Sequence, residues 1–112
     1  MPAFVVGVDF GTNSARAVVV DCADGRALGS AVSGYPSGER GVLLDERNPH
    51  FARQNPGDYL GALRASVRGA LDEAAREPGF SRERVVGIGT DTTGSTPLPV
   101  DAACRPLALD PR

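Results

Sequence analysis

The amino-acid sequence predicts an α/β fold with a mixed sheet, its elements in the order β-β-β-α-β followed by short strands. Three observations support this prediction. Apolar runs separated by turn residues fill the first third of the chain, a helical repeat of apolar residues follows, and another apolar run leads into a loop rich in hydroxyl side chains. Because one helix cannot cover both faces of such a sheet, we expect the domain to be incomplete.

The first three strands are expected to be antiparallel neighbours. Residues 4–8 form a nearly continuous apolar run, which is typical of a strand buried on both faces. A second β-rich run covers 15–21, and the turn between them contains Gly11 and Asn13, which tolerate left-handed backbone angles. Asp24-Gly25 is a hairpin signal, so residues 27–32 are predicted as the third strand.

Residues 34–54 are irregular, with a short strand expected at 42–44. Loops of this length are usually functional or interfacial. A helix is predicted to follow, with Asn55 as N-cap, Pro56 in the first turn and Pro78-Gly79 after its end. Its expected apolar face consists of Leu60, Leu63, Val67, Leu71 and Ala74.

Residues 84–91 read as a strand that returns parallel to the first one through a right-handed crossover. A hairpin is then expected, with strands at 98–101 and 106–109.

Composition excludes several classes of function. The 112 residues hold at most one domain, and a net charge of -2 without a basic patch argues against nucleic acid. No apolar stretch is long enough to span a membrane, and two cysteines without a disulfide pattern indicate a reducing cytoplasm. The single His50 is expected to be a plain loop residue rather than a metal ligand, and the aromatic residues Tyr35, Phe51 and Tyr59 are expected to pack.

The first candidate site follows the first strand. Asp9 lies at its carboxyl end, Gly11 opens a polar turn, and Arg16 lies in the next strand. Phosphate groups bind to backbone N–H groups, hydroxyls and a cation, and a nearby carboxylate can hold Mg²⁺. From spacing alone, an ordinary turn with a surface arginine is an equally good reading. The segment lacks the Walker A pattern.

The second candidate site is residues 87–95, where another strand ends in Asp91 and hydroxyl residues. In open α/β sheets, ligands bind outside the carboxyl ends of the strands. If the two strands are parallel neighbours, Asp9 and Asp91 face one crevice. Seen alone, Asp91 could equally be a loop residue that caps backbone amides.

These motifs resemble a known family. Residues 6–16, VGVDFGTNSAR, resemble the first phosphate motif of the FGGY carbohydrate kinases. Residues 86–97, VGIGTDTTGSTP, and residues 55–60, NPGDYL, resemble the L-ribulokinase branch of that family. The resemblance implies a ribonuclease H-like (actin-like ATPase) fold. It also implies that residues 1–112 are the N-terminal part of the first kinase domain, with the second domain absent.

The resemblance implies ATP-dependent phosphorylation of L-ribulose to L-ribulose 5-phosphate, in L-arabinose catabolism, with Mg²⁺ held by Asp9. It implies that the phosphates lie along Gly11, Thr12, Asn13, Ser14 and Arg16. The sugar pocket is bordered by Asp91, Thr93, Gly94 and Ser95. The catalytic base is expected beyond Arg112, so no catalytic residue is assigned here and the chain alone is expected to be inactive. The only partner implied is the sugar, and a homodimer of the complete protein is compatible with the family.

Three alternatives stay open at this point. A sibling kinase for xylulose, ribitol or glycerol would share the first motif. A non-kinase member of the actin-like superfamily would turn over ATP without a sugar. A non-enzymatic binding module would bind no nucleotide.

Overall fold

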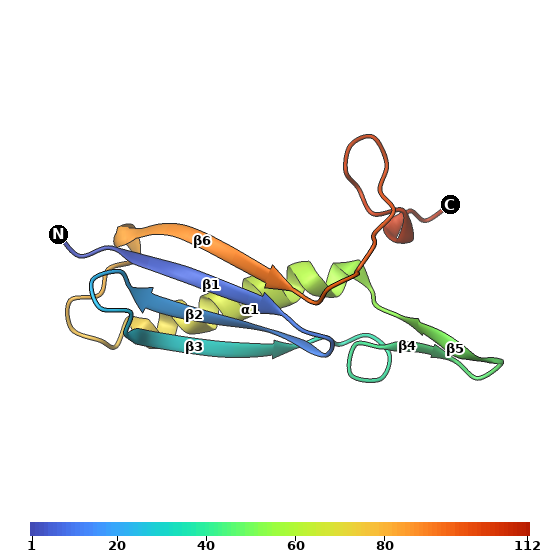
Figure 1. Ribbon diagram of the computed structural model, residues 1–112, viewed down its shortest axis with the longest axis horizontal. Helices are drawn as coiled ribbons and strands as arrows, with labels where there is room; N and C mark the ends of the chain where they lie inside the picture. The colour runs from blue at the N-terminus through green and yellow to red at the C-terminus, as the bar shows by residue number, and fades with distance from the viewer.

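The computed structural model describes residues 1–112 and has one principal sheet (Figure 1). Its strands are β1 (Phe4–Phe10), β2 (Ser14–Asp21), β3 (Ala27–Gly34) and β6 (Val85–Thr92), in the order β3-β2-β1-β6. The first three pair antiparallel, and β6 pairs parallel to β1. The predicted mixed sheet and the predicted parallel return are both confirmed.

The two tight turns of the sheet form in different ways. Between β2 and β3, Gly25 takes a left-handed φ of 77°, and the amide of Asp21 donates to the carbonyl of Arg26. Between β1 and β2 no residue is left-handed, so Gly11 and Asn13 do not use the left-handed backbone angles that they tolerate. Gly11 is favoured there by space instead, because a Cβ at this position would lie 3.3 Å from the carbonyl oxygen of Ser14.

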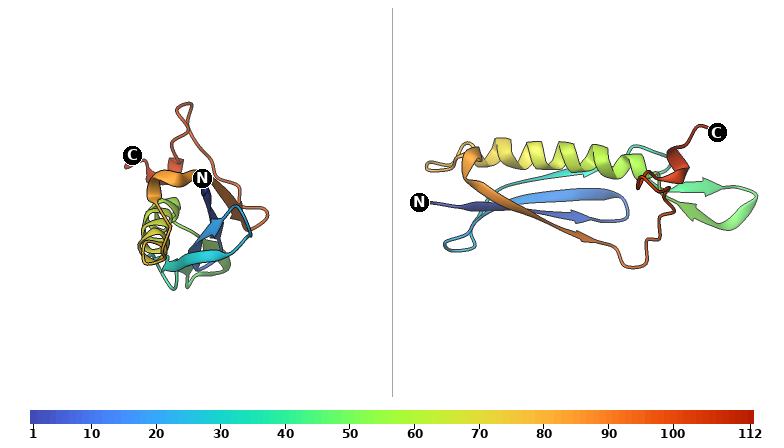
Figure 2. Two further views of the ribbon diagram at one scale, coloured as in Figure 1. Left: turned by 90° about the vertical axis from the view of Figure 1, so that its left-hand side faces the viewer. Right: turned by 90° about the horizontal axis from the view of Figure 1, so that it is seen from above.

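Helix α1 (Pro56–Ala74) lies along one face of the sheet (Figure 2), and Asn55 caps it as predicted by accepting from the amide of Gly57. The predicted apolar face is confirmed at Ala74, which is buried, and at Leu63, Val67 and Leu71, which are partly buried against the core. It was wrong at Leu60, which is 56% exposed. The face against the sheet is made mostly of small residues, namely Ala62, Ser66, Ala70 and Ala74.

The small residues allow the helix backbone to approach the sheet closely. A Cβ on Gly29 of β3 would lie 2.5 Å from the amide nitrogen of Ala74 and closer still to the carbonyl of Ala70. A Cβ on Gly69 of α1 would lie 2.6 Å from the Cβ of Ala31. Hydrophobic periodicity in the sequence does not predict this helix–sheet contact, because alanine, serine and glycine contribute little to the apolar pattern.

A second, two-stranded sheet projects from the end of the principal sheet at which β3 ends (Figure 1). It consists of β4 (Leu43–Asp45) and β5 (Asn48–Arg53). The short strand expected at 42–44 is therefore present, shifted by one residue. Its partner was missed, because Asn48-Pro49 resembles a turn rather than a strand.

The C-terminal segment contains less regular structure than predicted. The hairpin expected at 98–109 is reduced to one bridge, Val100 with Pro106, followed by a 3₁₀ turn at Leu107–Leu109. The carboxylate of Asp101 holds this loop by accepting from the amides of Ala103 and Arg105. None of the helices combines the length and the apolar composition that a membrane-spanning helix requires.

Candidate active site

Three charged residues form a row across the sheet at the carboxyl ends of β1 and β6. Asp9 is the register partner of Arg16 on β2 and of Asp91 on β6. Directly paired residues project from the same face of a sheet. Since Phe4, Val6 and Val8 face α1, these three project from the opposite face, and all three are exposed. The expected juxtaposition of Asp9 and Asp91 is therefore present in the register, and no ion pair occupies either carboxylate.

The turn between β1 and β2 directs its carbonyl groups toward the protein body. The carbonyl of Thr12 accepts from the side-chain amide of Gln54 at 2.7 Å, and that of Asn13 accepts from the amide of Tyr35 at 2.9 Å. The backbone N–H groups of Thr12 and Asn13 have no acceptor within the protein, whereas that of Gly11 is used by the carbonyl of Ser14. Successive free N–H groups of this kind suit an anion.

The side chain of Asn13 points away from such an anion, because its amide donates to the carbonyl of Arg40 at 2.8 Å. Arg40 itself takes a left-handed φ of 51°. The contribution of Asn13 to anion binding would thus come from its backbone.

The hydroxyl-rich loop after β6 is joined to this turn. The amide of Thr93 donates to the carbonyl of Phe10 at 3.2 Å, and the amide of Thr92 donates to the carboxylate of Asp91. Ser95 takes a left-handed φ of 58°, which is uncommon for a residue other than glycine. A Cβ on Gly94 would meet nothing within 4 Å. The two predicted sites therefore adjoin, with Thr93, Gly94 and Ser95 all exposed.

An aromatic cluster supports the site from the helix side. Tyr59 packs edge-on against Phe10, with ring centroids 6.2 Å apart, and against Tyr35, with centroids 5.6 Å apart. Tyr35 is only 4% exposed, and its hydroxyl has no hydrogen-bond partner. Burial raises the pKa of Tyr35, and Tyr59, Asp9 and Asp58 raise it further through their charges. Burial likewise raises the pKa of Tyr59. Packing was the predicted role of both residues.

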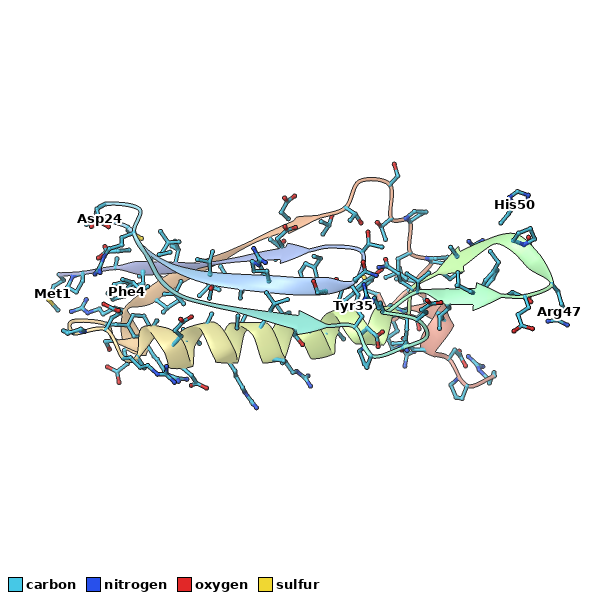
Figure 3. All side chains as sticks on the ribbon, turned by 90° about the horizontal axis from the view of Figure 1, so that it is seen from below. Met1, Phe4, Asp24, Tyr35, Arg47 and His50 are labelled. Carbon is cyan, nitrogen blue, oxygen red and sulfur yellow. The ribbon has the colours of Figure 1, made fainter.

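Other singled-out residues lie outside the site. His50 is exposed on β5 and, like Arg47, lies toward the far tip of the hairpin in Figure 3, whereas Tyr35 lies at its base. The two cysteines are free and exposed. Phe51 is half-buried beneath the guanidinium of Arg53, 5.0 Å from the ring centroid.

Sequence reasoning missed Gln54 and the carbonyl of Arg40, both of which contact the turn. The single available signal was position, since Gln54 directly precedes the N-cap of α1. No local pattern connects it with a turn forty residues earlier.

The fold and the sequence were compared with known proteins. A xylulose kinase from Brucella ovis superposes with a TM-score of 0.69 at 24% identity, and covers 92% of the chain and 19% of that structure. A gluconate kinase from Lactobacillus acidophilus gives the same TM-score at 19% identity, over 96% of the chain and 19% of that structure. The chain therefore has the fold of part of these sugar kinases.

Sequence similarity is more specific. Ribulokinase from Geobacillus thermodenitrificans is 40% identical over 96% of the chain, and that from Shouchella clausii is 38% identical over all of it. Ribulokinase from Mycolicibacterium smegmatis is 39% identical over 95%. Over the stretch that it spans, the chain is thus similar to ribulokinases from several bacteria. It spans about a fifth of the length of these ribulokinases. No family model matches it.

Proposed function

We propose that the complete protein transfers the γ-phosphoryl group of ATP to a hydroxyl of L-ribulose, as part of L-arabinose catabolism. In this proposal the chain supplies the phosphate-binding turn and one border of the sugar pocket. The observation that carries it is the pair of free N–H groups at Thr12 and Asn13, adjoining the row formed by Arg16, Asp9 and Asp91. The ribulokinase relatives support the choice of sugar.

The chemistry of these residues fits ATP and Mg²⁺. Asp9 provides an unpaired, exposed carboxylate, which would hold a hydrated Mg²⁺. The turn amides and hydroxyls of Thr12 and Ser14, with the guanidinium of Arg16, would bind and orient the phosphates. Bound Mg²⁺ would neutralise charge on the phosphoryl group as it is transferred.

The sugar would lie at the loop after β6, bordered by Asp91, Thr93, Gly94 and Ser95. Its hydroxyl groups match the exposed hydroxyl and carboxylate side chains of this loop. The open space around Gly94 leaves room for a ligand close to the backbone.

We further propose that residues 1–112 are part of the first of two kinase domains, and that the catalytic base lies outside them. The chain alone would then bind phosphate weakly and transfer nothing. Sugar-dependent release of ADP by the purified 112-residue chain would contradict this.

The substrate is tested by a panel of sugars and polyols offered to the complete protein with ATP and Mg²⁺. L-ribulose is expected to give the highest kcat/KM, ahead of xylulose, ribitol and glycerol. A higher kcat/KM for another sugar or polyol would favour the second candidate function, a sibling kinase. The fold similarity to the xylulose kinase is the observation behind this candidate. Sugar-independent ATP turnover would reject both. A homodimer stays an expectation to be measured by sedimentation.

The role of Asp9 is tested by Asp9→Asn. Loss of the carboxylate charge is expected to lower kcat/KM by about 10²–10³-fold, the range seen when one group that stabilises transferred charge is removed. Asp24→Asn is the matched control, because Asp24 lies in the distant β2–β3 turn and an asparagine can still accept from the amide of Arg26. Equal kcat/KM values for the two variants would show that Asp9 does not hold Mg²⁺ as proposed.

A further inference from the structure

Gln54 connects the candidate phosphate turn to helix α1. It lies between the end of β5 and the N-cap Asn55, and its side chain makes two hydrogen bonds. Its amide nitrogen donates to the carbonyl of Thr12 at 2.7 Å, and its amide oxygen accepts from the hydroxyl of Tyr59 at 2.5 Å. Because a carbonyl can only accept, the NH₂ group of Gln54 must face Thr12, which leaves its oxygen for Tyr59.

Tyr59 is held by rigid surroundings. It lies in the first turn of α1, and its ring is packed between Phe10 at the end of β1 and Tyr35 after β3. The same helical turn is tied down through Asp58, whose buried carboxylate accepts from both the amide and the hydroxyl of Ser37. The hydroxyl of Tyr59 therefore occupies a fixed position from which it orients Gln54.

The bond to Thr12 has a geometric consequence for the next amide. In a trans peptide unit the C=O and N–H groups point in opposite directions. When Gln54 holds the carbonyl of Thr12 toward the body, the N–H of Asn13 must point outward. This N–H is one of the two free donors of the turn.

We propose that Gln54, oriented by Tyr59, is a positioning residue that presents the N–H of Asn13 to a phosphate of the nucleotide. The proposal rests on the proposed function, and it deepens it by assigning a role to a residue outside the phosphate motif. Without this support the Thr12–Asn13 peptide loses the bond that fixes its carbonyl, and nucleotide binding weakens while the sugar site is untouched.

The test compares Gln54→Met and Tyr59→Phe in the complete protein, with Arg47→Met as control. Methionine fills similar space but cannot donate, phenylalanine keeps the aromatic packing, and Arg47 is an exposed residue of the β4–β5 turn that bonds only to Asp45. The measurements are the Kd of ATP by calorimetry, the KM of ATP and of the sugar, kcat, and the thermal midpoint.

Gln54→Met is expected to raise the Kd and KM for ATP about five- to tenfold, the effect of losing one neutral hydrogen bond or slightly more. Tyr59→Phe is expected to raise them about two- to threefold. The double variant is expected to match Gln54→Met alone, because Tyr59 acts through Gln54. The KM of the sugar and all values for Arg47→Met stay unchanged.

Two results would overturn the proposal. One is an unchanged ATP affinity in Gln54→Met, and the other is an equal rise in the KM of ATP and sugar, which indicates general loosening. If wild-type protein binds ATP but lacks sugar-dependent turnover, the proposed function fails while the ATP affinities still decide the role of Gln54. If wild type binds no ATP, both fail.

Discussion

At the scale of single residues, the two tyrosines beside the site hold their protons more tightly than usual. Burial raises the pKa of Tyr35 and of Tyr59 above the ordinary value of 10.0. Since the unfolded chain loses these protons near the ordinary value, their contribution to stability is fully present below pH about 10 and is lost as the pH rises further.

This predicts the behaviour of Tyr35→Phe. At neutral pH the substitution should leave stability nearly unchanged, because the hydroxyl that it removes has no partner. Above pH about 10 the variant should lose stability less steeply than wild type. Thermal unfolding of both proteins across pH 7–11, with tyrosinate absorbance as the titration readout, checks this. A large loss at neutral pH would instead indicate an unseen partner for the hydroxyl.

At the scale of elements, the contact between α1 and the sheet is set by small residues. Gly69 faces the Cβ of Ala31, whereas a Cβ on Gly61 of the same helix would meet nothing within 4 Å. Alanine in place of either glycine should improve the intrinsic helix propensity by about 1 kcal/mol. Only Gly69→Ala adds the overpacking penalty of about 1–3 kcal/mol.

We therefore predict different outcomes for two identical substitutions. Gly61→Ala should raise the thermal midpoint of the complete protein, and Gly69→Ala should lower it or leave it nearly unchanged. The difference between the two isolates the packing penalty, because the propensity gain is common to both. Equal midpoints would show that the helix can move away from the sheet without cost.

Sequence patterns were sufficient for elements that depend on neighbouring residues. The alternation of apolar runs and turns predicted β1, β2, β3 and β6, and Asn55-Pro56 predicted the start of α1. Features that depend on distant contacts were not predictable in this way. The small-residue face of α1 and the bond from Gln54 to Thr12 both require two segments to be brought together, and no local pattern encodes that.

The candidate site also contains features that local sequence predicts and features that it does not. The charges of Asp9 and Asp91 were found from their position at strand ends, and the register then aligned them. Their roles toward metal, phosphate and sugar stay predictions.

At the scale of the whole molecule, the chain is extended, and only one face of its principal sheet is covered by a helix. Its radius of gyration is 16.7 Å, against about 13 Å for a compact domain of this length. Its accessible surface is 7747 Å², against about 5,800 Å² for a compact protein of 11.6 kDa. Apolar side chains of β6 are among those exposed, with Val86 at 69% and Ile88 at 59%.

From this we predict that the 112-residue chain by itself lacks a cooperative unfolding transition. Its buried core is confined to one side of the sheet, and a solvent-open hollow of about 300 Å³ lies beside Leu63, Val67 and Ile88. Calorimetry of the isolated chain should show a broad, weak transition. A sharp transition with matching calorimetric and van't Hoff enthalpies would contradict this.

The parallel pairing of β1 with β6 also orders events during synthesis. The strands begin at Phe4 and Val85, so the second is made about eighty residues after the first. At roughly 5–20 residues per second, the ribosome needs about 4–16 seconds to cover that interval. The β1–β2–β3 meander can form within it, but Asp91 can join Asp9 only afterwards. The nascent chain thus carries the candidate phosphate turn before it carries the opposite wall of the candidate site.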